Sequence, residues 1–153
     1  MRKRVLVIDD DAQARALVAA SLESKGSEVR GATGGVNGLT LADAEPPDVI
    51  LLDLEMPGMD GYEVCRILRQ GPKTGSIPVV MLTASDDPHL NREAYAAGAQ
   101  ACVPKPFRKD SLIAVIEAAR WRAGPERTRG RAVVSLYAVI LRPSRPNPYP
   151  RKT

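Results

Sequence analysis

The chain has 153 residues and a hydrophobic fraction of 44%, which suits one globular domain with a short extension. No apolar run approaches the ~20 residues that a membrane-spanning helix needs, and the apolar stretch near the N-terminus, residues 5–8, is too short for a signal peptide. The two cysteines lack metal-ligand spacing, so we expect reduced thiols in a cytoplasmic protein.

The net charge of +4 is unevenly distributed along the chain. Residues 1–120 hold 14 lysines and arginines against 17 aspartates and glutamates, whereas residues 121–153 hold eight basic residues and one acid. We therefore predict a mildly acidic domain over residues 1–121 and a basic, proline- and arginine-rich C-terminal tail over residues 122–153 that is poorly ordered.

Strand-like apolar runs alternate with stretches of helical periodicity. The expected strands cover residues 4–9, 27–32, 48–53, 77–84 and 100–104. The expected helices cover residues 12–25, 34–45, 61–70, 88–99 and 108–121. Five strands alternating with five helices predict a doubly wound α/β fold, with a parallel sheet that carries helices on both faces.

Two helices have apolar stripes that predict their buried sides. For the first helix these residues are Ala14, Leu17, Val18 and Leu22. For the third helix they are Tyr62, Val64, Cys65 and Leu68. Gly26 is placed to end the first helix, and Pro104, which has no backbone N–H, fits an edge strand.

Chemically active side chains follow four of the five strands. Asp9, Asp10 and Asp11 come after the first strand, Asp53 ends the third, Thr83 the fourth, and Lys105 follows the fifth. In doubly wound sheets ligands bind outside the carboxyl ends of the strands, so we expect these side chains to converge. Asp11 also fits the N-cap of the first helix, which is the commoner role of such a residue.

Several carboxylates at one sheet edge repel each other unless a cation lies among them, and hard oxygen ligands suit Mg²⁺. A carboxylate such as Asp53, held beside that cation, can attack phosphorus and form an aspartyl phosphate. Phosphoryl transfer then requires mainly positioning and positive charge, which Lys105 supplies, with a hydroxyl donor from Thr83.

The motifs VIDDD, LLDLEMPGMDGYE, VVMLTA and AGAQACVPKPF resemble the receiver domain of two-component response regulators over residues 4–120. The resemblance implies a flavodoxin-like sheet of order 2-1-3-4-5 with Asp53 as the phosphoacceptor. It implies that Asp9 or Asp10, with the backbone carbonyl of Glu55, helps to hold Mg²⁺; Asp10 is the better-placed ligand by position and Asp9 the supporting acid.

The same resemblance implies that Thr83 and Lys105 contact the phosphoryl group and that the Lys105–Pro106 peptide is cis. It also implies a phosphorylation switch that is no enzyme beyond autodephosphorylation, that receives its phosphoryl group from a histidine kinase or phosphotransfer protein, and that acts on an unknown downstream protein. The resemblance is compatible with a homodimer. Cys102 departs from the pattern, because family members often carry an aromatic switch residue there. Glu55 and Ser85 are expected to tune dephosphorylation.

Other functions remain open at this stage. A phosphatase with an aspartate nucleophile carries its DxD pattern on the first strand, whereas Asp53 lies on the third, and the single histidine, His89, suggests an exposed helix start rather than a donor site. A degenerate receiver would serve only as an interaction module. The tail has no dedicated role, adds a strand to a partner, or contacts nucleic acid or an anionic membrane; its charge alone gives only non-specific affinity.

Overall fold

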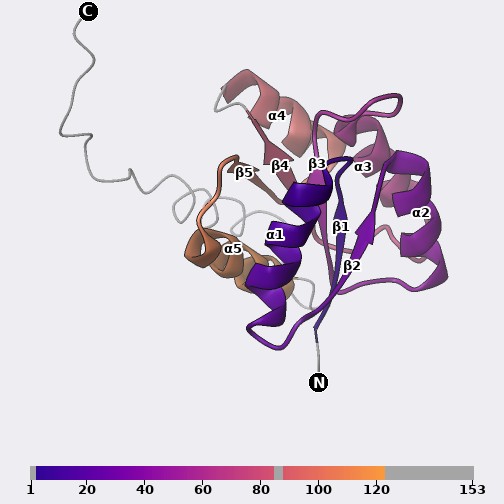
Figure 1. Ribbon diagram of the computed structural model, residues 1–153. Helices are drawn as coiled ribbons and strands as arrows, with labels where there is room; N and C mark the ends of the chain where they lie inside the picture. Colours follow the sequence, from indigo (N-terminus) through magenta and orange to yellow (C-terminus); the bar gives the residue numbers. More distant parts are fainter. Residues whose placement is uncertain (1–2, 85–87, 123–153) are drawn as a thin grey trace, which may run out of the picture.

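The computed structural model describes residues 3–84 and 88–122 (Figure 1). The five strands are β1 (Arg4–Ile8), β2 (Glu28–Ala32), β3 (Val49–Asp53), β4 (Val79–Thr83) and β5 (Ala101–Pro104). The five helices are α1 (Ala12–Glu23), α2 (Gly35–Ala44), α3 (Gly61–Gln70), α4 (Pro88–Ala97) and α5 (Lys109–Arg122). The predicted tail, apart from Arg122, lies outside the described residues.

All strand pairs are parallel, and the order is β2-β1-β3-β4-β5, as the resemblance implied. The strands β3 and β4 are buried at every residue because helices cover both faces. One apolar cluster joins the sheet to α2, α3 and α4, and a second joins it to α1 and α5, which share a face in Figure 1. Pro104 lies on the edge strand β5, as predicted.

The predicted boundaries were one or two residues too long at several ends. The helix α1 stops at Glu23 because Lys25 and Gly26 donate to carbonyls three residues back, forming a closing turn that Gly26 completes at a φ of 85°. The strand β4 begins at Val79, two residues later than expected.

The predicted buried stripe of α1 was wrong at Leu17, and Ala14 is only half-buried. Val18 and Leu22 are buried as expected, but Leu17 is 55% exposed. The buried face of the helix follows Val18, Ser21 and Leu22, a spacing of three and four residues, which leaves Leu17 on the flank of that face. In α3 the prediction held for three residues, and Tyr62 is only half-buried.

Side chains from α3 donate hydrogen bonds to backbone carbonyls at both ends of α4. The Tyr62 hydroxyl donates to the Leu90 carbonyl at 3.0 Å in the first turn of α4. The Arg69 guanidinium donates to the Gly98 carbonyl at 2.7 and 2.9 Å, and to the Ile77 carbonyl at 2.6 Å. The two helices are therefore linked through main-chain acceptors as well as by apolar packing.

No helix within residues 3–84 and 88–122 is long and apolar enough to cross a membrane.

Candidate functional site

The carboxyl ends of the strands bring four of the predicted site residues into one group, three of them buried and Lys105 half-buried. Asp9 follows β1 and is fully buried, Asp53 ends β3 with 6% exposure, and Thr83 ends β4 with 2% exposure. Lys105 comes directly after β5, and its backbone N–H donates to the Thr83 carbonyl at 2.6 Å. Parallel pairing between β1, β3, β4 and β5 is what aligns these ends.

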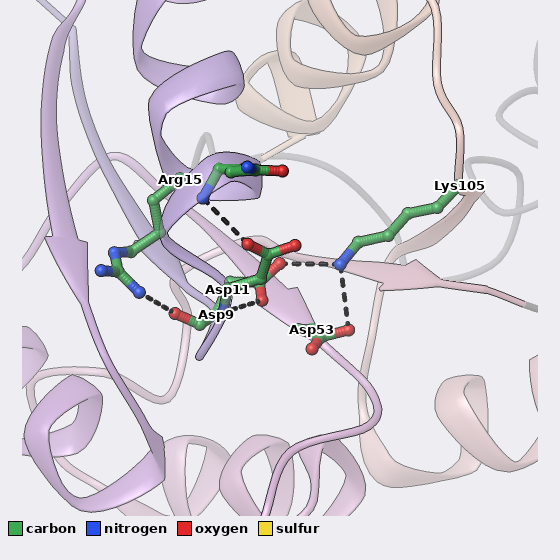
Figure 2. Close-up of polar contacts among 6 residues, drawn as sticks. Asp9, Asp11, Arg15, Asp53 and Lys105 are labelled. Atoms are coloured by element: carbon green, nitrogen blue, oxygen red, sulfur yellow. Dashed lines mark hydrogen bonds and ion pairs between the residues drawn. The ribbon is translucent and has the colours of Figure 1, made fainter.

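The Lys105 ammonium lies between two carboxylates (Figure 2). Its Nζ donates to Asp9 Oδ2 at 2.7 Å and to Asp53 Oδ1 at 3.4 Å. The Lys105–Pro106 peptide is cis, as the resemblance implied. A single cation thus bridges the ends of β1 and β3, and its contact with Asp9 is the shorter one.

The electrostatics of Asp53 follow from this geometry. Burial raises the pKa of Asp53 to about 6, and the Asp9 charge acts in the same direction. The Lys105 ammonium and a hydrogen bond from the Glu55 backbone lower it again, but by less. Burial alone would lower the pKa of Lys105, yet its bonds and charge interactions with Asp9 and Asp53 raise it overall. Lys105 therefore stays cationic at neutral pH.

Three acids form a group that fits a divalent cation. One ligand oxygen each from Asp9, Asp10 and Asp53 lies within 4.8 Å of the others. Asp10 is exposed, so this side of the group is open to water, and Mg²⁺ in proteins usually keeps several waters beside one or two carboxylates. Asp11 does not join the group; its carboxylate caps α1 by accepting from the Gln13 N–H at 2.9 Å.

The loop between β3 and α3 is built to approach the site closely. Gly58 has a φ of 80°, which few other residues adopt without strain. A Cβ on Gly61 would lie 2.6 Å from the Asp53 carbonyl oxygen, so glycine alone fits there. Asp60 caps α3 by accepting from the Glu63 N–H at 2.9 Å. The role of the Glu55 carbonyl as a metal ligand stays a prediction.

The two thiols lie in the core rather than at the site. Cys65 and Cys102 are both buried, as expected for Cys65. Burial raises the pKa of Cys102 to about 12, despite a hydrogen bond with Tyr95 from α4. Cys102 therefore stays a neutral thiol, and the half-buried Tyr95 is the aromatic ring packed beside it. His89 is exposed at the start of α4, as predicted.

Sequence reasoning missed an apolar surface next to the site. A shallow pocket of about 360 Å³ lies between α1 and the segment after β5. Its lining residues are Asp11, Gln13, Ala14, Leu17, Lys105, Pro106 and Phe107. The available signal was Leu17 itself, because an apolar residue beside the main stripe of a helix can face a partner rather than the core.

Comparison with known proteins places this arrangement in a family. The model of the response regulator receiver domain matches residues 5–117. The DNA-binding dual master transcriptional regulator RpaA of Synechocystis sp. is 35% identical over 144 residues, which are 93% of this chain and 60% of RpaA. The response regulator MprA of Mycobacterium avium is 40% identical over 141 residues, which are 92% of this chain and 60% of MprA.

The solved structures give the same result. A response regulator structure from Chloroflexus aurantiacus has a TM-score of 0.77 and 32% identity, and it covers 80% of this chain and 100% of the other. The chain belongs to the response regulator receiver domain family. It contains the receiver domain of a two-component response regulator, and it spans about 60% of the length of the curated relatives that it matches.

Proposed function

We propose that this chain is a phosphorylation switch in which Asp53 accepts a phosphoryl group from a histidine kinase or phosphotransfer protein. The observation that carries the proposal is the placement of Lys105 between Asp9 and Asp53, with Asp10 on the solvent side. This set has a nucleophile, a fixed cation and oxygen ligands for Mg²⁺ at one edge of the sheet. A chain that served only as an interaction module would not need such a group of buried charges.

The transfer step uses Asp53 as the nucleophile. One carboxylate oxygen forms a bond to phosphorus while the bond between phosphorus and the donor imidazole nitrogen breaks, and its electron pair returns to that nitrogen. In this proposal Lys105 and the Thr83 hydroxyl stabilise the negative charge on the phosphoryl oxygens. Mg²⁺, held by Asp9, Asp10, Asp53 and the Glu55 carbonyl, would supply further positive charge.

The pKa of Asp53 suits this role. With a pKa of about 6, the Asp53 carboxylate is mostly ionised at neutral pH and can attack phosphorus. Because the side chain is buried, its charged form is less stable than that of an ordinary aspartate. No turnover of other substrates is required, and we propose no enzymatic activity beyond release of the same phosphoryl group to water.

The pocket beside Lys105 favours a protein as the donor. Leu17 is exposed and Phe107 half-buried, and both line a shallow apolar depression that adjoins the ammonium group. An apolar contact of this kind would let a donor protein present its phosphohistidine to Asp53. A small donor such as acetyl phosphate needs no such surface, so the two donor classes can be separated by Leu17→Ser.

A regulator that contacts DNA is the second candidate for the output. RpaA is named as DNA-binding, and the similarity to it covers 93% of this chain. The basic charge after residue 121 is compatible with nucleic acid. Unchanged DNA retention after deletion of residues 122–153 would remove the tail from this proposal.

The test of the switch is the intact mass of the protein after incubation with acetyl phosphate and Mg²⁺. We expect one added phosphoryl group, lost in Asp53→Asn and without Mg²⁺. The matched control is Asp43→Asn, an exposed acid on α2. If no group is added, and beryllium fluoride also fails to bind the folded protein, the chain is not a phosphorylation switch.

A further inference from the structure

Arg15 reaches back from the first turns of α1 to the backbone at the end of β1. Its Nη1 donates to the Asp9 carbonyl at 2.7 Å (Figure 2). Asp9 lies one residue beyond the strand, and its own N–H donates to the Ala32 carbonyl of β2 at 3.1 Å. The Asp9 main chain is therefore fixed on one side by β2 and on the other by the arginine.

The path of the arginine depends on a glycine in a different element. A Cβ on Gly31 of β2 would lie 3.2 Å from Arg15 Cδ and 3.6 Å from Nε, so the arginine stem crosses the strand where no side chain stands. Gly31 pairs with Val7, two residues before Asp9. The guanidinium reaches the Asp9 carbonyl across this gap.

We propose that Arg15 is a positioning residue for the Asp9–Asp10 acid pair and, through it, for the divalent cation. The inference rests on the proposed function. The Asp9 carbonyl and the Asp10 N–H belong to one planar peptide unit, which joins the two Cα atoms that carry the acid side chains. Holding the carbonyl oxygen therefore fixes the orientation of this unit. Among the described residues Arg15 forms no ion pair with a carboxylate, so its effect passes through the main chain.

Other contacts complete the orientation of Asp9. The Asp11 N–H donates to Asp9 Oδ1 at 2.9 Å, and Lys105 holds Oδ2. The carboxylate and the carbonyl of Asp9 are thus both fixed, and Asp10 is the exposed member of the pair. Groups that orient a metal ligand without touching the metal are worth about tenfold or more in metal affinity.

The experiment is calorimetric titration of the full chain with Mg²⁺, without phosphodonor. Arg15→Met keeps the stem and removes the donors, and we expect its Mg²⁺ Kd to rise about tenfold. Arg15→Lys restores a donor and recovers part of the loss. Gly31→Ala keeps the charge but displaces the stem, and it shifts the Kd in the same direction by a smaller factor.

The matched control is Arg30→Met, which removes an exposed β2 arginine that pairs with Glu45 at 2.7 Å and leaves the Kd unchanged. An Arg15→Met protein with a lower Tm but a wild-type Kd would overturn the inference, because the arginine would then only attach α1 to the sheet. If Arg15→Met fails to fold, Gly31→Ala with an unchanged Kd overturns it equally. No Mg²⁺ binding by the wild-type chain would instead reject the proposed function and this inference together.

Discussion

Asp9 and Asp53 are two buried aspartates at the ends of neighbouring strands, but their surroundings differ. Asp9 accepts hydrogen bonds at 2.7 and 2.9 Å on its two carboxylate oxygens. Asp53 is 3.4 Å from the same lysine, and its pKa is raised to about 6. The closest donors therefore orient the supporting acid, whereas the acid proposed to react has the longer lysine contact and a pKa raised by burial.

Removing the shared cation breaks this comparison most severely. In Lys105→Met both carboxylates lose their cationic partner, and the phosphoryl group loses a fixed positive charge. We expect phosphorylation by acetyl phosphate to slow about 100-fold, the usual effect of deleting one such donor. The initial rate is measured by intact mass, with Lys109→Met, an exposed lysine at the start of α5, as the control. Equal rates in the two variants would contradict the assignment.

The raised pKa of Asp53 predicts a pH-dependent stability. Its folded-state value of about 6 exceeds the ordinary 3.8, so the folded protein binds the proton more tightly than the unfolded chain. The stabilisation is full below pH about 4 and is lost as the pH rises through about 6. At pH 8 without Mg²⁺, Asp53→Asn should therefore have a free energy of unfolding about 3 kcal/mol higher than the wild type.

Urea unfolding at pH 4.5 and pH 8 measures this difference. The gain from Asp53→Asn should shrink at the lower pH, and added Mg²⁺ should reduce it at pH 8 by stabilising the wild type. Asp43→Asn, an exposed acid, controls for the general effect of removing a charge. A difference that does not vary with pH would contradict the raised pKa.

Neutralising Asp9, the supporting acid, should reduce the difference between the surroundings of the two aspartates. Asp9→Asn removes the negative charge that raises the pKa of Asp53, and it leaves Lys105 to interact with Asp53 alone. We expect the pKa of Asp53 to fall and the Mg²⁺ affinity to drop about tenfold. Carbon-detected NMR titration of the Asp53 carboxyl group follows the pKa, and an unchanged value would show that Asp9 exerts no field there.

The smallest effect belongs to the third acid of the DDD run. Asp11 caps α1, and Asp11→Ala should lower the free energy of unfolding by about 1 kcal/mol. Its backbone N–H, which donates to Asp9, is retained. The Mg²⁺ affinity should stay within about twofold of the wild type, an allowance that covers a modest second-sphere change. A tenfold loss of affinity would place Asp11 among the metal ligands instead.

The sequence predicted the fold and the members of the site because both depend on local patterns. Alternating strands and helices require a parallel sheet, and the carboxyl ends of parallel strands share an edge. Asp53, Thr83 and Lys105 could therefore be grouped without coordinates. Their chemical roles stay proposals, because grouping does not measure reactivity.

The remaining features depend on contacts between distant elements. The sequence alone gives Arg15 no role beyond that of an ordinary helical residue. Only the structure shows that Gly31, on β2, leaves room for its side chain. Leu17 fits a helical stripe by spacing, but the tilt of α1 on the sheet decides which flank is covered, and that tilt is a tertiary property. Whether Lys105 lies closer to Asp9 or to Asp53 likewise follows from rotamers that no pattern encodes.

The attachment of α4 has an evolutionary consequence. Tyr62 and Arg69 bind the carbonyl oxygens of Leu90 and Gly98, atoms that almost any residue would present at those positions. Substitutions at exposed positions of this helix, such as Arg92 and Glu93, leave both anchors in place. Selection can therefore diversify the outer surface of α4 while its attachment to α3 and the arrangement of side chains at the sheet edge are retained.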